Sequence, residues 1–215
     1  MRASPPVLQK TFSGPDYADL SKPSKERIAL AARRLFMMYG IYISLREIAE
    51  LAETNEATAI QYCQSHSNLV QVYVQELIGE NETHWTRTAA EHPNDPEAQL
   101  RSWIERIELR CGDAFDEVCA LLRAAAQLFR FGSPPLLTQV RAVRARELNR
   151  IAQLCRKAKF DEPSRLAHKL VLLVDGARSN SNSFGHDGPH SHLSEAAGDL
   201  MAAHRGGAKL VSPLD

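Results

Sequence analysis

The feature that most constrains the fold is a helical repeat of apolar residues that runs through most of the chain. From about residue 24 to residue 204, apolar side chains recur three and four positions apart, and the alternating pattern of strands is missing. Proline, glycine and capping residues interrupt the repeat, and each interruption ends one helix and begins another. We therefore predict an all-α protein of about nine helices.

Residues 24–63 carry several helix-start and helix-stop signals in close succession. Gly40 closes the first helix, because glycine readily adopts the left-handed conformation beyond a helix C-terminus. Ser44 and Glu47 form the capping box of a second helix, and Asn55 can cap a third. A longer helix followed by two short ones predicts a helix-turn-helix over residues 44–63.

The remaining helices form a larger C-terminal bundle. Asp95-Pro96 and Ser133-Pro134 each place a capping residue before a proline at the first helical position. The predicted helices cover residues 65–91, 96–110, 113–131, 134–158, 164–179 and 193–204. We expect a flexible arm over 1–20, a helix-turn-helix domain over 21–66, a larger helical domain over 67–205 and a flexible tail over 206–215.

The composition favours a cytoplasmic protein with no membrane partner. No apolar run approaches the roughly 20 residues that span a bilayer, and the N-terminus lacks the pattern of a signal peptide. The four cysteines are scattered and contain no Cys-x-x-Cys pair, so buried free thiols are favoured over a zinc or redox site. The chain contains 26 Lys and Arg residues and 26 Asp and Glu residues, so any surface that binds nucleic acid would have to be a local one.

Catalytic motifs are missing from the chain. It has no Gly-rich phosphate loop after a strand, no nucleophile elbow and no recognisable pair of carboxylates. We therefore predict no enzyme activity and no cofactor, and a helical-bundle enzyme is the least favoured alternative.

Two stretches carry a family resemblance. The first helix ends in Leu35-Phe36 and then Gly40, and a Ser44-Leu-Arg-Glu-Ile-Ala49 sequence follows. Residues 167–177 are Leu-rich and end in Asp-Gly-Ala. The chain thereby resembles the TetR family of transcriptional regulators, closely over residues 25–78 and loosely beyond them. The resemblance implies a homodimer that binds a double-stranded DNA operator, acts as a repressor and is released by a small apolar effector. It also implies that residues 67–205 form the ligand-binding and dimerisation domain.

The resemblance also implies where each site lies. The DNA-binding residues would be Lys25, Ser44, Arg46, Asn55, Thr58, Ala59, Gln61, Tyr62 and His66, with Lys22 and Arg27 able to supply further phosphate contacts. The ligand pocket would involve Trp103, Ile107, Cys111, Phe115, Cys119, Leu122 and Phe129. The dimer interface would involve Leu166, Leu170, Leu173, Val174, Ala177 and Leu200.

The predicted DNA-facing surface departs from the family pattern. The positions of a phosphate-contacting Tyr and Lys are occupied by Ile60 and His66, and Glu53 and Glu56 add negative charge nearby. Each lost cation removes roughly one released counterion from the binding free energy. The alternative is a TetR-fold protein with degenerate operator recognition that acts through protein or small-molecule binding.

Two polar segments are interpreted as ordinary surface. Arginines crowd the helix from Leu136 to Phe160, and we interpret them as a solvated face balanced by acids such as Glu147. His186, His190 and His192 could bind zinc, but their spacing matches no metal motif. A surface loop is favoured there, and no metal is predicted.

Overall fold

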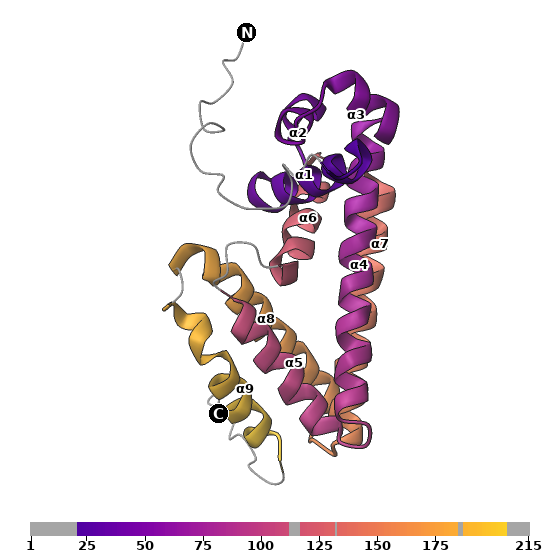
Figure 1. Ribbon diagram of the computed structural model, residues 1–215. Coiled ribbons are helices and arrows are strands. Elements are labelled where there is room, and N and C mark those ends of the chain that lie inside the picture. Colours follow the sequence, from indigo (N-terminus) through magenta and orange to yellow (C-terminus); the bar gives the residue numbers. More distant parts are fainter. Residues whose placement is uncertain (1–20, 112–116, 132, 185–186, 206–215) are drawn as a thin grey trace. The chain divides into compact units, whose positions relative to one another are not determined.

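The computed structural model describes residues 21–111, 117–131, 133–184 and 187–205, and over these ranges the protein contains helices and no strand (Figure 1). The all-α prediction is confirmed. The predicted arm (1–20) and tail (206–215) lie outside the described ranges. The chain divides into two compact units, residues 1–73 and 74–215, and the division falls within α4 (His66–Glu91). Among the described helices, none is long and apolar enough to cross a membrane.

The first unit contains α1 (Ser24–Tyr39), α2 (Leu45–Leu51), α3 (Glu56–Cys63) and the start of α4. Ser44 and Glu47 form both halves of the predicted capping box, and the Asn55 side chain accepts from the Thr58 amide at 2.8 Å. Gly40 ends α1 with φ 92° and ψ 174°, so its positive φ is as expected but its ψ is extended rather than left-handed helical.

Apolar side chains from all four helices form the core of this unit. Ile28, Leu35 and Ile48 are fully buried. The Phe36 ring packs against Tyr73 at 5.3 Å between centroids, which holds α1 against the first turns of α4. The start of α4 therefore belongs to the core beneath the helix-turn-helix.

The second unit contains the rest of α4 and the C-terminal helices. These are α5 (Pro96–Arg110), α6 (Glu117–Phe131), α7 (Pro134–Lys157), α8 (Pro163–Phe184), the short 3₁₀ helix η2 (Pro189–His192) and α9 (Leu193–Ala203). Asp95 caps α5 by accepting from the Ala98 amide at 2.9 Å, whereas Ser133 makes no side-chain cap bond. The predicted end of α8 at residue 179 is wrong, because the helix continues through a polar stretch to Phe184.

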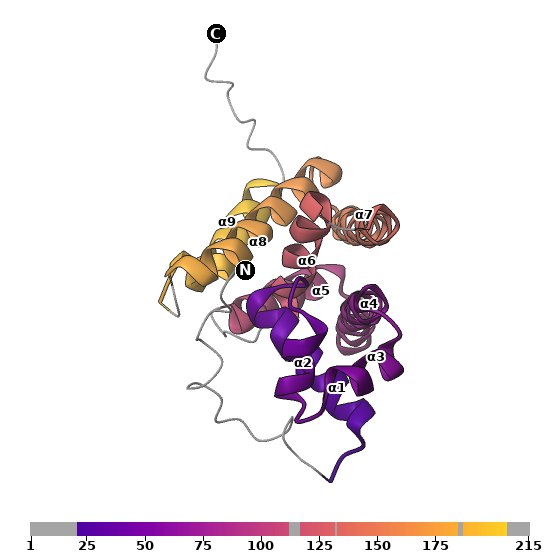
Figure 2. The ribbon, with the colours of Figure 1, turned by 90° about the horizontal axis from the view of Figure 1, so that it is seen from above.

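Helix α8 occupies the middle of the C-terminal bundle. Figure 2 shows it between α7 and α9, and it contacts both of these helices and α5. Leu166, Leu170 and Val174 on α8 are buried together with Ile104 of α5 and Met201 of α9. The most apolar stripe of α8 therefore faces the core of its own chain.

The segment before α9 is not the surface loop that the sequence suggests. His190 is only 2% exposed, because η2 packs against α8 and α5. His192 is exposed and lies 3.3 Å from the Glu195 carboxylate, while His186 lies outside the described ranges. Within the described residues, no cluster of three or more His, Cys, Asp or Glu side chains could hold a metal ion.

Candidate functional site

A buried arginine fixes the turn between α2 and α3. The Arg27 side chain is 8% exposed and donates from Nε to the Ala52 carbonyl at 3.0 Å. Its two other nitrogens donate to the carbonyls of Lys22, at 3.2 Å, and Glu53, at 3.4 Å. Arg27 thus joins α1 to the residues that set the direction of α3. The expectation that it contacts phosphate is wrong, because its donors are directed into the protein.

Helix α3 presents one solvent face, which differs in part from the predicted one. Glu56, Ala57, Ile60 and Gln61 are exposed, with Ile60 at 46%. Ala59, which the sequence places on the DNA face, is 0% exposed because it packs into the core between the helices. That prediction is wrong, and helical geometry explains it, since Ala59 and Cys63 lie one turn apart on the inner side.

Several of the predicted DNA-binding residues are engaged in local structure. The hydroxyl of Ser44 and the amide oxygen of Asn55 form the caps of α2 and α3. The Thr58 hydroxyl donates to Asn55 at 3.1 Å. The His66 Nε2 lies 2.8 Å from the Ile43 carbonyl, and its ring meets Phe36 edge-on, so this side chain holds the start of α4 in place.

Among the described residues, two of the predicted DNA-binding cations have exposed side chains near α3. Arg46 on α2 has 75% of its side chain exposed and pairs with Glu50 one turn away. The exposed Lys25 places its Nζ 5.1 Å from the centre of the Tyr62 ring, which joins the start of α1 to α3. The side chains of Lys25, Arg46 and Gln61 are exposed, so each can reach a ligand as large as DNA.

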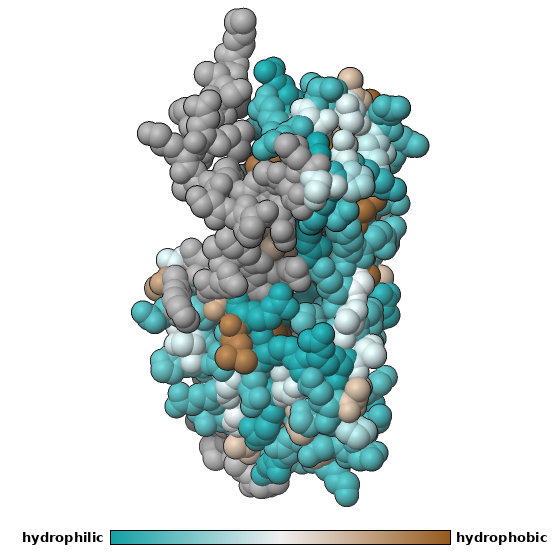
Figure 3. All heavy atoms as spheres, viewed as in Figure 1, coloured by the Kyte–Doolittle hydropathy of each residue, from teal (hydrophilic) through white to brown (hydrophobic). Residues whose placement is uncertain are grey.

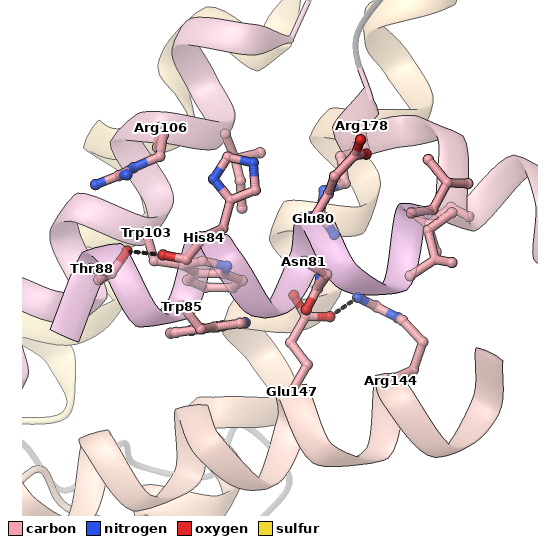
Figure 4. A pocket seen from close by; sticks show the side chains of 14 residues that line it. Glu80, Asn81, His84, Trp85, Thr88, Trp103, Arg106, Arg144, Glu147 and Arg178 are labelled. Atoms are coloured by element: carbon pink, nitrogen blue, oxygen red, sulfur yellow. Dashed lines mark hydrogen bonds and ion pairs between the residues drawn. The ribbon is translucent and has the colours of Figure 1, made fainter. Parts of the chain in front are cut away.

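The second unit contains a pocket with about 660 Å³ of empty space, including its open mouth. Trp85 and Trp103 stack in its wall at 5.5 Å between centroids, and both are buried (Figure 4). Four α4, α5 and α6 residues complete the apolar lining: Leu77, Ile107, Leu121 and Leu122. Eight polar residues also line it: Glu80, Asn81, His84, Thr88, Arg106, Arg144, Glu147 and Arg178.

An ion-pair network crosses the pocket wall from α7 to α8. Arg144 donates to Glu147 on its own helix and, at 2.5 Å, to Asp175 on α8. Asp175 lies 3.4 Å from Arg178, which is 6% exposed. Glu147 is 2% exposed, so the interpretation of the α7 charges as a solvated face is wrong at this position. Periodicity could have indicated this, because Glu147 falls on the same face of α7 as Val140, Val143 and Ile151.

The predicted pocket residues are divided between several environments. Trp103, Ile107 and Leu122 line the pocket. Cys111 is buried in the core cluster instead, and Phe129 is 70% exposed, so its placement in the pocket is wrong. Cys119 lies on α6 and Phe115 falls outside the described ranges. The polar half of the lining was not predicted, and it comes from α4, α5, α7 and α8.

The predicted dimer residues are mostly internal. Leu166, Leu170, Val174 and Ala177 are buried in the core of their own chain, so they are wrong as surface contacts. Leu173 and Leu200 are partly buried against that core, whereas Leu172 is 76% exposed. On the face shown in Figure 3, hydrophobic residues of this unit form small separate spots in a hydrophilic surface.

The helical order and the two units match solved structures. A TetR-family transcriptional regulator from Streptomyces coelicolor superposes with a TM-score of 0.73 at 19% identity, over 85% of this chain and 96% of that one. The chain has the TetR fold. A regulator from Saccharomonospora viridis, solved in complex with choline, gives a TM-score of 0.67 at 19% identity, over 83% and 95% of the two chains.

A third matching structure is that of AibR in complex with isovaleryl coenzyme A and operator DNA. It superposes with a TM-score of 0.66 at 15% identity, over 83% of this chain and 98% of that one. No protein-family sequence model matches the chain, and no curated protein matches it in sequence. At these identities the similarity establishes the fold.

Proposed function

We propose that this protein is a cytoplasmic, ligand-responsive transcriptional repressor that binds operator DNA as a homodimer. The observation that carries the proposal is the helix-turn-helix of the first unit, in which Arg27 fixes the turn and α3 presents an exposed face. The AibR complex, with its operator DNA and acyl coenzyme A, supports the same function for a protein of this fold.

The exposed side chains assign roles on the DNA. The recognition helix of such a motif lies in the major groove with its early residues at base edges. Gln61 would bond an adenine edge, and Ala57 and Ile60 would contact thymine methyl groups. Lys25 and Arg46 would contact phosphates. Because α3 contains no Lys or Arg, its contacts with the bases would involve no charged donor and would favour A·T pairs.

Fluorescence anisotropy on DNA from upstream of the protein's own gene and on a randomised operator library tests this function. We expect a preferred sequence whose affinity falls by orders of magnitude between about 50 mM and about 200 mM salt. Gln61→Ala should weaken binding by about tenfold or more, whereas Gln71→Ala, at an exposed position of α4, should not. Weak binding without sequence preference across the library would contradict the proposal.

That contrary result would favour the second candidate, a TetR-fold protein that acts through small-molecule or protein binding. Its supporting observation is the composition of the α3 face, where Glu56 and Ile60 stand beside few cations. The pocket of the second unit would then carry the whole function.

The homodimer would form through the outward faces of α8 and α9. Leu172 on α8 is 76% exposed, and the small residues Ala202 and Ala203 lie exposed on α9. Helices with small outward residues can pack closely against a two-fold-related pair as a four-helix bundle. Leu172→Glu should yield monomers in analytical ultracentrifugation, and Leu109→Glu, at an 84% exposed leucine of α5, should not. A stable dimer of the first variant would refute this placement.

Release from DNA would follow from a shift between two states of the dimer. A ligand in the pocket lowers operator affinity only by the difference between its affinities for the two states. The pocket is formed by helices α4 to α8, and α4 continues into the core of the DNA-binding unit. Ligand contacts with α4 are therefore the contacts through which the two units would be coupled.

A further inference from the structure

Glu147 is left with an unused hydrogen-bond acceptor in the wall of the pocket. Its side chain is 2% exposed, and one carboxylate oxygen, Oε2, accepts from Arg144. The other oxygen, Oε1, is buried and has no hydrogen-bond partner. Buried polar atoms in proteins nearly always have a partner, so an orphaned carboxylate oxygen in a pocket wall indicates where a ligand donor belongs.

The arginines of the pocket are already neutralised by acids. Arg144 is shared between Glu147 and Asp175, and Arg178 also meets Asp175. Arg106 donates to Glu91 at 2.5 Å. An anionic ligand would therefore meet only guanidinium groups that already pair with carboxylates. Glu80 adds a further carboxylate to the lining. A carboxylate oxygen without a partner favours a ligand that donates a hydrogen bond, and the strongest such bond comes from a positively charged donor.

The rest of the lining is suited to an apolar body. Figure 4 shows the stacked Trp85 and Trp103 on α4 and α5, with Glu147 and Arg144 reaching from α7 toward Asn81. The guanidinium of Arg150 lies 5.2 Å from the Trp85 ring centre, so this ring already has a cation beside it. A ligand cation would therefore be directed to Glu147 while its apolar part contacts the tryptophans and leucines.

We propose that the effector is a compact amphipathic amine, with an apolar or aromatic body and one protonated nitrogen that donates to Glu147 Oε1. This inference rests on the proposed function, because it names the ligand class of the regulator's pocket. It also replaces the expected small apolar effector with an amphipathic one, since eight polar residues line the cavity.

Intrinsic fluorescence reports occupancy directly, because the two tryptophans of the chain are Trp85 and Trp103. The probes are phenylbutylamine, phenylbutanol and phenylbutyrate, which share a body and differ in the head group. On the unmodified protein the amine should bind about tenfold tighter than the alcohol, the ratio expected from one charge-assisted hydrogen bond. The carboxylate should bind weakest. This comparison needs no variant.

Glu147→Gln should remove most of the preference for the amine and leave the alcohol nearly unchanged. The variant keeps the shape and an acceptor for Arg144, and circular dichroism checks its fold. Glu105→Gln makes the same change at an exposed position of α5 and should leave all three affinities unchanged. Equal binding of amine and alcohol, tighter binding of the carboxylate, or no saturable quenching by the amine up to its solubility would each overturn the proposal.

The operator assay on the same preparations separates this inference from the proposed function. Preference for the amine without any operator binding would retain the ligand class and reject the repressor. Operator binding without preference for the amine would retain the repressor and reject the ligand class.

Discussion

Replacing Arg27 with Met should destabilise the helix-turn-helix, because the side chain of Arg27 is directed into the protein. Met keeps a long apolar stem, so the substitution removes mainly the bonds to the carbonyls of Ala52, Glu53 and Lys22. A hydrogen bond from a charged donor contributes about 1.5–3 kcal/mol, and the bonds at 3.2 Å and 3.4 Å count for less than the one at 3.0 Å. We expect a loss of about 2–4 kcal/mol from the free energy of opening this unit.

Hydrogen-exchange mass spectrometry on peptides from α2 and α3 measures that loss locally. If the free energy of opening falls by about 2–4 kcal/mol, the backbone amides of these peptides should exchange about 30-fold to about 700-fold faster. The matched control is Arg46→Met. The Arg46 side chain is 75% exposed and pairs with Glu50, so its replacement should change the free energy of opening by less than about 0.5 kcal/mol. Exchange of Arg27→Met within about threefold of the unmodified protein would refute the role of Arg27 as a support of α3.

Three further predictions follow from single residues. Glu53 has φ 49°, so Glu53→Gly should raise the free energy of unfolding by about 0.5–1 kcal/mol in urea titrations, whereas Glu53→Ala, which keeps the strain, should not. Ile60→Lys should steepen the salt dependence of operator binding by about one counterion relative to Ile60→Gln, because the longer lysine side chain can extend from the base edge to a phosphate, and an unchanged slope would show that no phosphate lies within its reach. Burial raises the pKa of Cys155 from 9.0 to about 11, and the folded state therefore favours the neutral thiol. Stability should fall as the pH rises through this range, by up to about 1.4 kcal/mol per pH unit, and Cys155→Ala should lack that slope in urea titrations.

The helix boundaries were largely predictable because the signals that set them are local. The caps of Ser44, Asn55 and Asp95 each act within three residues, and the structure contains all three bonds. The end of α8 was predicted too early, since the polar residues 180–183 and then Phe184 continue the helix without any local stop signal. Serine and asparagine are poor helix formers alone, but tertiary context overrides such weak preferences.

Which side of a helix faces the core was predictable only in part. The sequence indicates that α8 is apolar over most of its circumference, which fits burial on two sides. It does not assign Leu166 and Leu170 to the chain's own core and Leu172 to the outside, because that depends on where α5, α7 and α9 pack. The same reason placed Phe129 wrongly in the pocket.

The sequence by itself determined the helical class, the positions of the helices and the helix-turn-helix, because caps and apolar periodicity act within a few residues along the chain. The tertiary structure alone decided the site chemistry. It brings Glu147, Arg144 and Asp175 together from α7 and α8 with the tryptophans of α4 and α5, and it leaves one carboxylate oxygen unbonded. No local sequence pattern predicts these contacts, since a hydrogen bond between residues distant in sequence forms only when the helices of the bundle have packed.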